Sequence, residues 1–100
     1  MISLKTAQEF DELIKKEFVI VNFYADWCAP CKMLDIVLEE VSNEHPELTI
    51  VKVDADRFRS IGKEYHVLSV PVIAIFENGK IVKEQKGLMR KEELLSFIGK

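Results

Sequence analysis

The chain has 100 residues, 48% of them hydrophobic and 31% charged, the balance of one globular domain spanning residues 1–100. Its net charge of −3 argues against a basic face for nucleic acid or for an anionic membrane. The N-terminus lacks the apolar stretch of a signal peptide, and the longest apolar-rich run, 18–25, is too short to span a bilayer, so we expect a cytoplasmic protein.

The N-terminal part of the chain predicts a helix followed by a buried strand, and a short strand can precede both. Thr6 followed by Glu9 is the pattern of a capping box, and apolar residues at helical spacing follow it. A helix is therefore expected over about 7–16. Residues 17–25, EFVIVNFYA, form a nearly continuous run of β-branched and aromatic residues. Such a run is typical of a strand that is buried on both faces.

The middle of the chain predicts a helix, a strand and a shorter helix. An amphipathic pattern begins near Pro30 and ends near Asn43. Residues 48–56, LTIVKVDAD, indicate another buried strand. Residues 57–67 favour a short helix, although Gly62 weakens it.

The C-terminal part predicts a β-hairpin and a final helix. Two strand-like runs within 70–87 flank Asn78-Gly79, a pair favoured in tight hairpin turns. An amphipathic helix follows over 91–98, with no obvious cap at its start.

This order of elements predicts an α/β fold. Strands that alternate with helices imply parallel pairing through right-handed crossovers, and the C-terminal hairpin adds antiparallel strands. We expect a central mixed sheet of four to five strands, flanked on both faces by about four helices. The crossover from Ala25 to Pro30 places Cys28 and Cys31 at the carboxyl end of a buried strand, where open α/β sheets hold their sites.

The two cysteines have two residues between them, and three roles are open to such a pair. A structural zinc site needs four ligands, and His45 and His66 are not spaced as a second pair, so no metal is expected. A disulfide across so short a loop constrains the unfolded chain little. The exposed first turn of a helix, by contrast, favours the thiolate of Cys28 and holds Cys31 behind it, close enough to bond. The spacing therefore favours a redox role, with zinc binding as an alternative.

The chain resembles the thioredoxin family over essentially its whole length. The resemblance is carried by WCAPCK after VNFYAD, by Val70-Pro71, by FENGK in the hairpin and by Gly87. It implies a thioredoxin fold and a monomeric protein-disulfide reductase without a cofactor, re-reduced by a thioredoxin reductase. Cys28 would be the attacking thiolate that forms a mixed disulfide with a substrate protein, and Cys31 would resolve it, leaving the pair oxidised.

The same resemblance implies a surface around the sulfurs that docks substrates. Pro71 would match the family's cis-proline facing the disulfide, and Val70 would offer its backbone groups to an extended segment of substrate. An exposed apolar patch at this place would be functional. The residues of this docking surface would be Trp27, Ala29, Pro30, Leu68, Val70, Pro71 and Gly87.

Asn22 departs from the family pattern, in which a buried Asp is thought to shuttle a proton for the resolving cysteine. Because Asn cannot ionise, Lys52, which matches the family's buried Lys, would lack its usual acidic neighbour. We expect slower resolution at neutral pH. A hydrogen-bonded Asn22–Lys52 pair that serves only stability is an alternative interpretation.

Two other functions fit the sequence. One is an oxidant or isomerase, although the family's more oxidising members usually carry His at the position of Pro30. The other is a thioredoxin-like protein-binding or chaperone module in which the thiols are incidental. A variant without both thiols separates the last case, because a binding module keeps its function and a reductase loses it.

Overall fold

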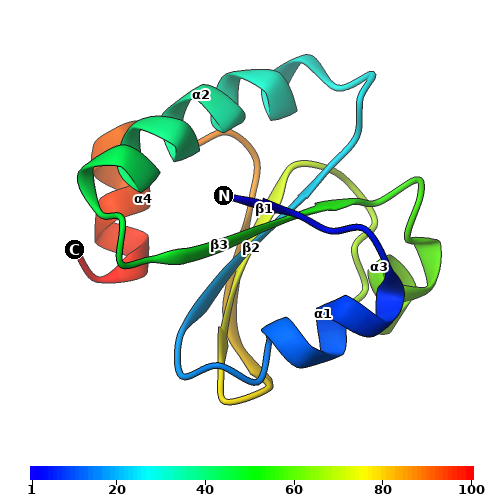
Figure 1. Ribbon diagram of the computed structural model, residues 1–100. Helices are drawn as coiled ribbons and strands as arrows, with labels where there is room; N and C mark the ends of the chain where they lie inside the picture. Colours follow the sequence, from blue (N-terminus) through cyan, green and yellow to red (C-terminus); the bar gives the residue numbers. More distant parts are fainter.

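The computed structural model describes residues 1–100 as a five-stranded sheet with helices on both faces (Figure 1). Its elements are β1 (Ile2–Ser3), α1 (Ala7–Leu13), β2 (Val19–Tyr24), α2 (Ala29–Glu44), β3 (Thr49–Asp54), α3 (Arg59–Glu64), β4 (Val72–Glu77), β5 (Lys80–Lys86) and α4 (Lys91–Ile98). The strand order is β1-β3-β2-β4-β5. β1 and β2 pair with β3 in parallel, whereas β4 pairs antiparallel with both β2 and β5. The predicted mixed α/β sheet is confirmed.

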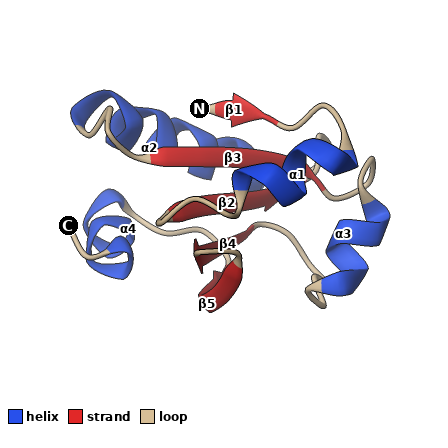
Figure 2. Cartoon of the chain, turned by 60° about the horizontal axis from the view of Figure 1, so that its bottom comes forward, coloured by secondary structure: helices blue, strands red, loops and turns tan.

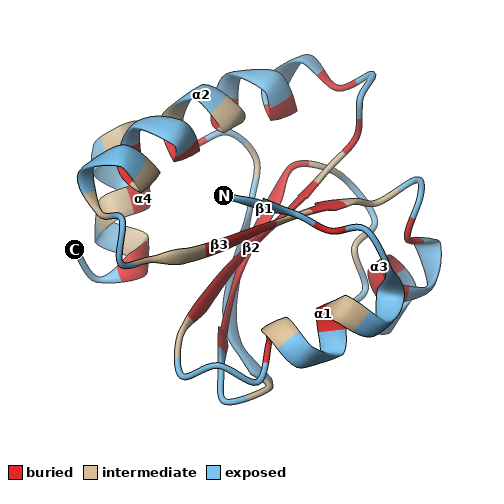
Figure 3. Cartoon of the chain, viewed as in Figure 1, coloured by how far each residue is buried: buried red, intermediate tan, exposed pale blue.

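The central strand, β2, is buried on both faces, as its sequence predicted. Val19, Val21 and Phe23 face α1 and α3, whereas Ile20 faces α2 and α4, and all four side chains are fully buried. Figure 2 shows the sheet between the two pairs of helices, and Figure 3 shows the buried positions along the central strands. A strand in this position fixes the place of the loop that follows it.

The helix α2 is anchored to the sheet along one side. Leu34, Leu38 and Val41 are fully buried and pack with Ile20 of β2 and Leu94 of α4. Burial of a leucine side chain contributes about 1.5–3 kcal/mol relative to exposure. The start of α2 is therefore held rigidly at the carboxyl end of β2.

The hairpin formed by β4 and β5 is confirmed, and it explains why α1 ends at Leu13 rather than near residue 16. Asn78 and Gly79 have φ values of 52° and 89°, as a tight two-residue hairpin turn requires. Their amides donate hydrogen bonds to carbonyls just beyond α1: Gly79 N to Ile14 O at 2.8 Å and Asn78 N to Lys16 O at 3.0 Å. The carbonyls of Ile14 and Lys16 are free to accept these hydrogen bonds because both residues lie beyond Leu13, the last residue of the helix.

Glutamates cap the first and last helices. In α1 the Thr6 hydroxyl accepts from Glu9 N at 3.2 Å, and the Glu9 carboxylate accepts from Lys5 N at 2.9 Å, one residue earlier than in a standard capping box. In α4, which the sequence left without a cap, Glu93 Oε1 accepts from the backbone N and from Nε of Arg90, both at 3.1 Å. This second cap is not apparent in the sequence, because Arg90 is not a typical capping residue.

The two edges of the sheet differ in length but not in accessibility. β1 pairs with β3 over only Ile2 and Ser3. β5 is exposed at every position from Lys80 to Lys86.

None of the helices combines the length and the hydrophobicity that a membrane span requires.

Candidate active site

The cysteine pair lies where the chain passes from β2 into α2, as predicted. Cys28 is the residue just before the helix, with extended backbone angles of −94° and 110°, and its Sγ accepts a hydrogen bond from Cys31 N at 3.2 Å. Pro30 lies in the first turn, where an amide would have no partner in the helix. The helix start therefore offers an N–H group to a sulfur anion.

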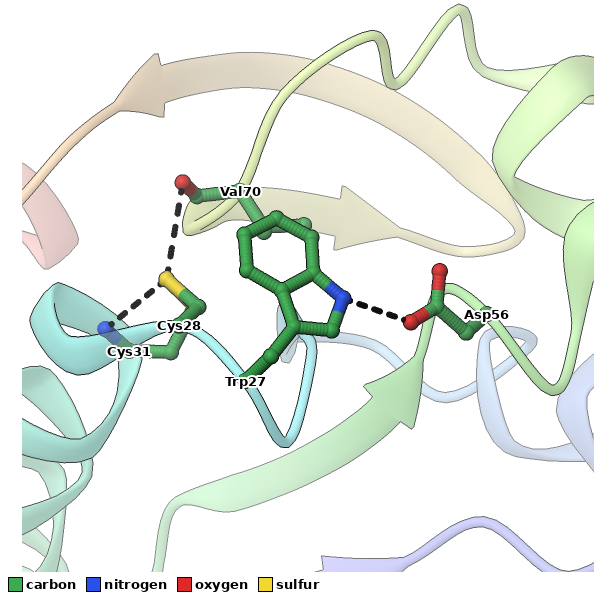
Figure 4. The surroundings of a disulfide bond; sticks show 5 residues. All are labelled: Trp27, Cys28, Cys31, Asp56 and Val70. Carbon is green, nitrogen blue, oxygen red and sulfur yellow. Dashed lines mark hydrogen bonds between the residues drawn. A yellow bond between two sulfur atoms is a disulfide. The ribbon is translucent and has the colours of Figure 1, made fainter.

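Cys28 and Cys31 form a disulfide, with their Cα atoms 5.3 Å apart. Both residues are nearly covered, with 4% of Cys28 and 3% of Cys31 exposed. The expectation of an exposed first sulfur is therefore wrong for this oxidised state. The Cys28 side chain turns inward toward the Cys31 amide, and its Sγ lies 3.8 Å from the Val70 carbonyl oxygen (Figure 4).

The segment that faces the disulfide lies just before β4. The Val70–Pro71 peptide bond is cis, as the resemblance implied for Pro71. The Pro71 carbonyl accepts from Gly87 N at 2.9 Å, so Gly87 holds this segment at the end of β5. The amide of Val70 has no hydrogen-bond partner in the chain. Val70 thus has a free amide, and its carbonyl lies beside the Cys28 sulfur.

The residues of the predicted docking surface range from exposed to buried. Trp27 is 73% exposed and Leu68 is 89% exposed, and both are large apolar side chains. The indole Nε1 of Trp27 donates to Asp56 Oδ2 at 2.8 Å, a contact that the sequence analysis missed. The other members range from exposed (Ala29, Pro30) through half-buried (Val70, Gly87) to buried (Pro71).

Asn22 and Lys52 are neighbours in the paired strands β2 and β3, but the alternative of a hydrogen-bonded pair is wrong. Asn22 is fully buried, and neither polar atom of its side chain has a hydrogen-bond partner. Lys52 has no acid at position 22, but a different carboxylate lies beside it, because its Nζ is 2.7 Å from Asp35 Oδ1. This contact is an ion pair without hydrogen-bond geometry. Asp35 lies four residues after Cys31 on α2, a spacing that could have identified it.

Cys31 borders a cavity of about 170 Å³ between α2 and the sheet. The Lys52 ammonium lies 5.1 Å from the centre of the Tyr24 ring at this cavity. Burial, followed by the nearby Asp54 carboxylate, raises the pKa of Tyr24 above its ordinary value, so the phenol is neutral at neutral pH. The lining residues are Asn22, Tyr24, Ala25, Asp26, Cys31, Lys32, Asp35 and Lys52.

The zinc alternative gains no support from the arrangement of its ligands. His45 lies at the opposite end of α2 from the cysteines, where its Nδ1 is 3.5 Å from Glu47 Oε2. No group of three or more His, Cys, Asp or Glu side chains could hold a metal ion.

A cysteine pair at a helix start, on a mixed sheet and facing a cis-proline segment, defines the class of dithiol-disulfide exchange proteins with a thioredoxin fold.

Comparison with known proteins gives the family. The sequence model of the thioredoxin family matches residues 1–100. A thioredoxin of Chlamydia trachomatis is 38% identical over 100 residues, which cover 100% of this chain and 98% of that protein. Thioredoxin-1 of Saccharomyces cerevisiae is 38% identical over 84 residues, covering 83% and 82%. The structure of Plasmodium falciparum thioredoxin matches with a TM-score of 0.91 and 30% identity, covering 99% of this chain and 97% of that one.

The chain belongs to the thioredoxin family. It is a thiol-disulfide oxidoreductase that reduces protein disulfides, and the alternative of a binding module with incidental thiols is not favoured. Its substrates are disulfide-containing proteins, and a reductase returns it to the dithiol form.

Proposed function

We propose that residues 1–100 act as a single-domain, monomeric, general reductant of cytoplasmic protein disulfides, in which Cys28 attacks and Cys31 resolves. A thioredoxin reductase supplies the electrons. The observation that carries the assignment is the position of Cys28 at the start of α2, with its Sγ 3.2 Å from the Cys31 amide.

In the first step the Cys28 thiolate attacks one sulfur of a substrate disulfide. The helix macrodipole and the Cys31 N–H favour that thiolate, because both place positive charge beside the sulfur. A mixed disulfide forms between Cys28 and the substrate. The other substrate sulfur leaves as a thiolate and takes a proton from water.

In the second step Cys31 loses its proton and its thiolate attacks Sγ of Cys28. The bond between Cys28 and the substrate breaks, and the second substrate sulfur leaves and is protonated. The substrate has gained two electrons and two protons, and the protein holds the Cys28–Cys31 disulfide. The 5.3 Å between the two Cα atoms lies within the range that a disulfide requires.

The docking surface positions the substrate for the first step. The free N–H of Val70 accommodates an extended segment of the substrate as a strand-like partner. Trp27, next to Cys28 in the chain, and Leu68, two residues before Val70, supply exposed apolar area. Recognition through backbone groups and apolar contacts depends little on the substrate's sequence, which suits a general reductant.

The test is reduction of insulin disulfides by the purified protein, with dithiothreitol as the electron donor. We expect strong catalysis by the wild type and none by Cys28→Ser. The matched Cys31→Ser variant, reduced and then mixed with insulin after the dithiothreitol has been removed, should keep the first step and accumulate a covalent complex with insulin. Failure of the wild type to catalyse would contradict the proposal. A binding activity that persists in the Cys28→Ser/Cys31→Ser variant would then support a binding module.

A further inference from the structure

The second step of the proposed reaction requires a route for the Cys31 proton. Only 3% of Cys31 is exposed, so bulk water has little direct access to its sulfur. The cavity beside Cys31 provides the alternative route. Its volume of about 170 Å³ exceeds the about 10–15 Å³ that one water molecule needs.

Most side chains that line this cavity cannot accept the proton. Asn22 does not ionise. The raised pKa of Tyr24, caused mainly by burial, keeps that phenol protonated. The ammonium groups of Lys32 and Lys52 are hydrogen-bond donors without an acceptor site. Two carboxylates remain, those of Asp26 and Asp35.

The geometry favours Asp35 over Asp26. Asp26 is exposed in the loop before the cysteines. Asp35 lies one helical turn after Cys31 on the same face of α2, and Cβ atoms at this spacing are about 5–6 Å apart. Its Oδ1 atom is buried beside the Lys52 ammonium without hydrogen-bond geometry, so the carboxylate keeps lone pairs that can receive a proton. Lys52 Nζ, at 2.7 Å, holds the carboxylate in place.

We propose that Asp35 is the general base that receives the Cys31 proton through water in this cavity, and that Lys52 is its positioning residue. The Cys31 S–H bond breaks as the new bond to Sγ of Cys28 forms, and the proton moves to the Asp35 carboxylate. The substrate sulfur leaves as a thiolate and is protonated by water. The carboxylic acid then returns its proton to solvent, and no further reagent is needed.

A second cavity gives the returned proton a way out. Asp35 and Lys52 also line a polar cavity of about 230 Å³ on the side away from Cys31, beside Met1 and Glu39. The ion pair therefore lies between the cavity at the cysteine and one near the chain's N-terminus. The titratable and charged groups that line the two cavities with Asp35 are Tyr24, Asp26, Cys31, Lys32, Glu39, Lys52 and the amino group of Met1.

The inference about Asp35 rests on the proposed roles of Cys28 and Cys31. One experiment distinguishes a failure of this inference from a failure of the proposed function. Reduced protein is mixed with 5,5′-dithiobis(2-nitrobenzoate) in a stopped-flow instrument. Attack by Cys28 releases the first coloured thiolate, and attack by Cys31 on the mixed disulfide releases the second. The two phases are recorded from about pH 5 to pH 9, across the range where thiols ionise.

We expect Asp35→Asn to leave the first phase within about twofold and to slow the second by about 100-fold at neutral pH, the low end for a positioned base. The difference should close as the pH rises through about 8.5, where thiols ionise unaided. Asp35→Glu should keep the second phase within about tenfold of the wild type. Asp26→Asn, the matched control, should leave it within about twofold.

Several outcomes would overturn the inference. The first is an Asp35→Asn variant whose second phase is as fast as in the wild type, or faster, at neutral pH. The second is an Asp35→Asn variant whose second phase is slowed equally at every pH. The third is a second phase that is slowed by Asp26→Asn instead. Unfolding transitions of the variants show whether each is folded. A wild type without a first phase would instead contradict the proposed function.

Discussion

The Trp27 indole and the Asp56 carboxylate join the two loops that follow β2 and β3, through a hydrogen bond of 2.8 Å from Nε1 to Oδ2 (Figure 4). Trp27 is 73% exposed, so packing alone does not hold its ring. The hydrogen bond therefore sets the direction of the largest apolar side chain beside Cys28.

Asp56→Ala should weaken substrate docking without changing the chemistry at the sulfurs. A net hydrogen bond of about 0.5–1.5 kcal/mol corresponds to an increase in KM of about 2- to 10-fold, with kcat nearly unchanged. Steady-state reduction of insulin measures both constants. Asp56→Asn retains an acceptor oxygen and should lie closer to the wild type. An unchanged KM in Asp56→Ala would show that the ring needs no such support.

A carboxylate placed on the opposite side of the same cavity should also accept the Cys31 proton. Asn22 lines that cavity and pairs in register with Lys52, so Asp35→Asn/Asn22→Asp moves the acid from α2 to β2. We expect this double variant to recover the second stopped-flow phase to within about tenfold of the wild type. Asp35→Asn/Asn22→Leu, which adds no acid, should not recover the rate of the second phase. Equal rates in the two double variants would refute this expectation.

The cap of α4 should make a pH-dependent contribution to stability. The hydrogen bonds from Arg90, first from its backbone and then from its side chain, lower the pKa of Glu93 below 4.5. A lowered pKa in the folded state means that the charged form stabilises the fold above that value and that this contribution is lost as the pH falls.

Glu93→Gln should therefore unfold at lower urea concentration than the wild type at neutral pH, and the difference should shrink as the pH falls below 4.5. Gln retains an acceptor oxygen, so the variant tests the charge. Urea unfolding across this range measures the difference in unfolding free energy. A difference that is constant with pH would exclude the carboxylate charge as its cause.

Two glycines should respond oppositely to substitution by alanine. Gly79 has a φ of 89°, and an added Cβ would meet nothing within 4 Å, so Gly79→Ala should cost about 1–2 kcal/mol through the backbone alone. Gly62 lies within α3, where an added Cβ would meet only Val67 Cβ, at 3.9 Å. Gly62→Ala should stabilise the protein by about 0.5–1 kcal/mol. Urea unfolding measures both, and the same sign in the two variants would contradict the prediction.

Local sequence patterns were sufficient to predict the elements that hold the site. The apolar run of β2 and the Asn78-Gly79 turn each determine structure within a few residues, so both could be read without knowing the rest of the fold. The end of α1 could not, because Ile14 and Lys16 meet a turn that lies more than 60 residues further along the chain.

The polar partners in the site were missed for a related reason. Asp35 appears on the polar side of an amphipathic helix, and only the placement of α2 over β3 brings it to Lys52. Asp56 becomes visible only once β2 and β3 are aligned in parallel, with Tyr24 opposite Asp54. These interactions depend on packing between distant segments, which periodicity within one segment does not encode.

The two edge strands have a consequence for aggregation. A sheet edge grows into a fibril when it offers a long, flat row of free amides to another chain. β1 is only two residues long, and β5 carries Lys80, Lys83 and Lys86 along an exposed strand. A second chain that paired with β5 would have to strip water from these ammonium groups. Both edges of the sheet therefore disfavour the templating of amyloid growth.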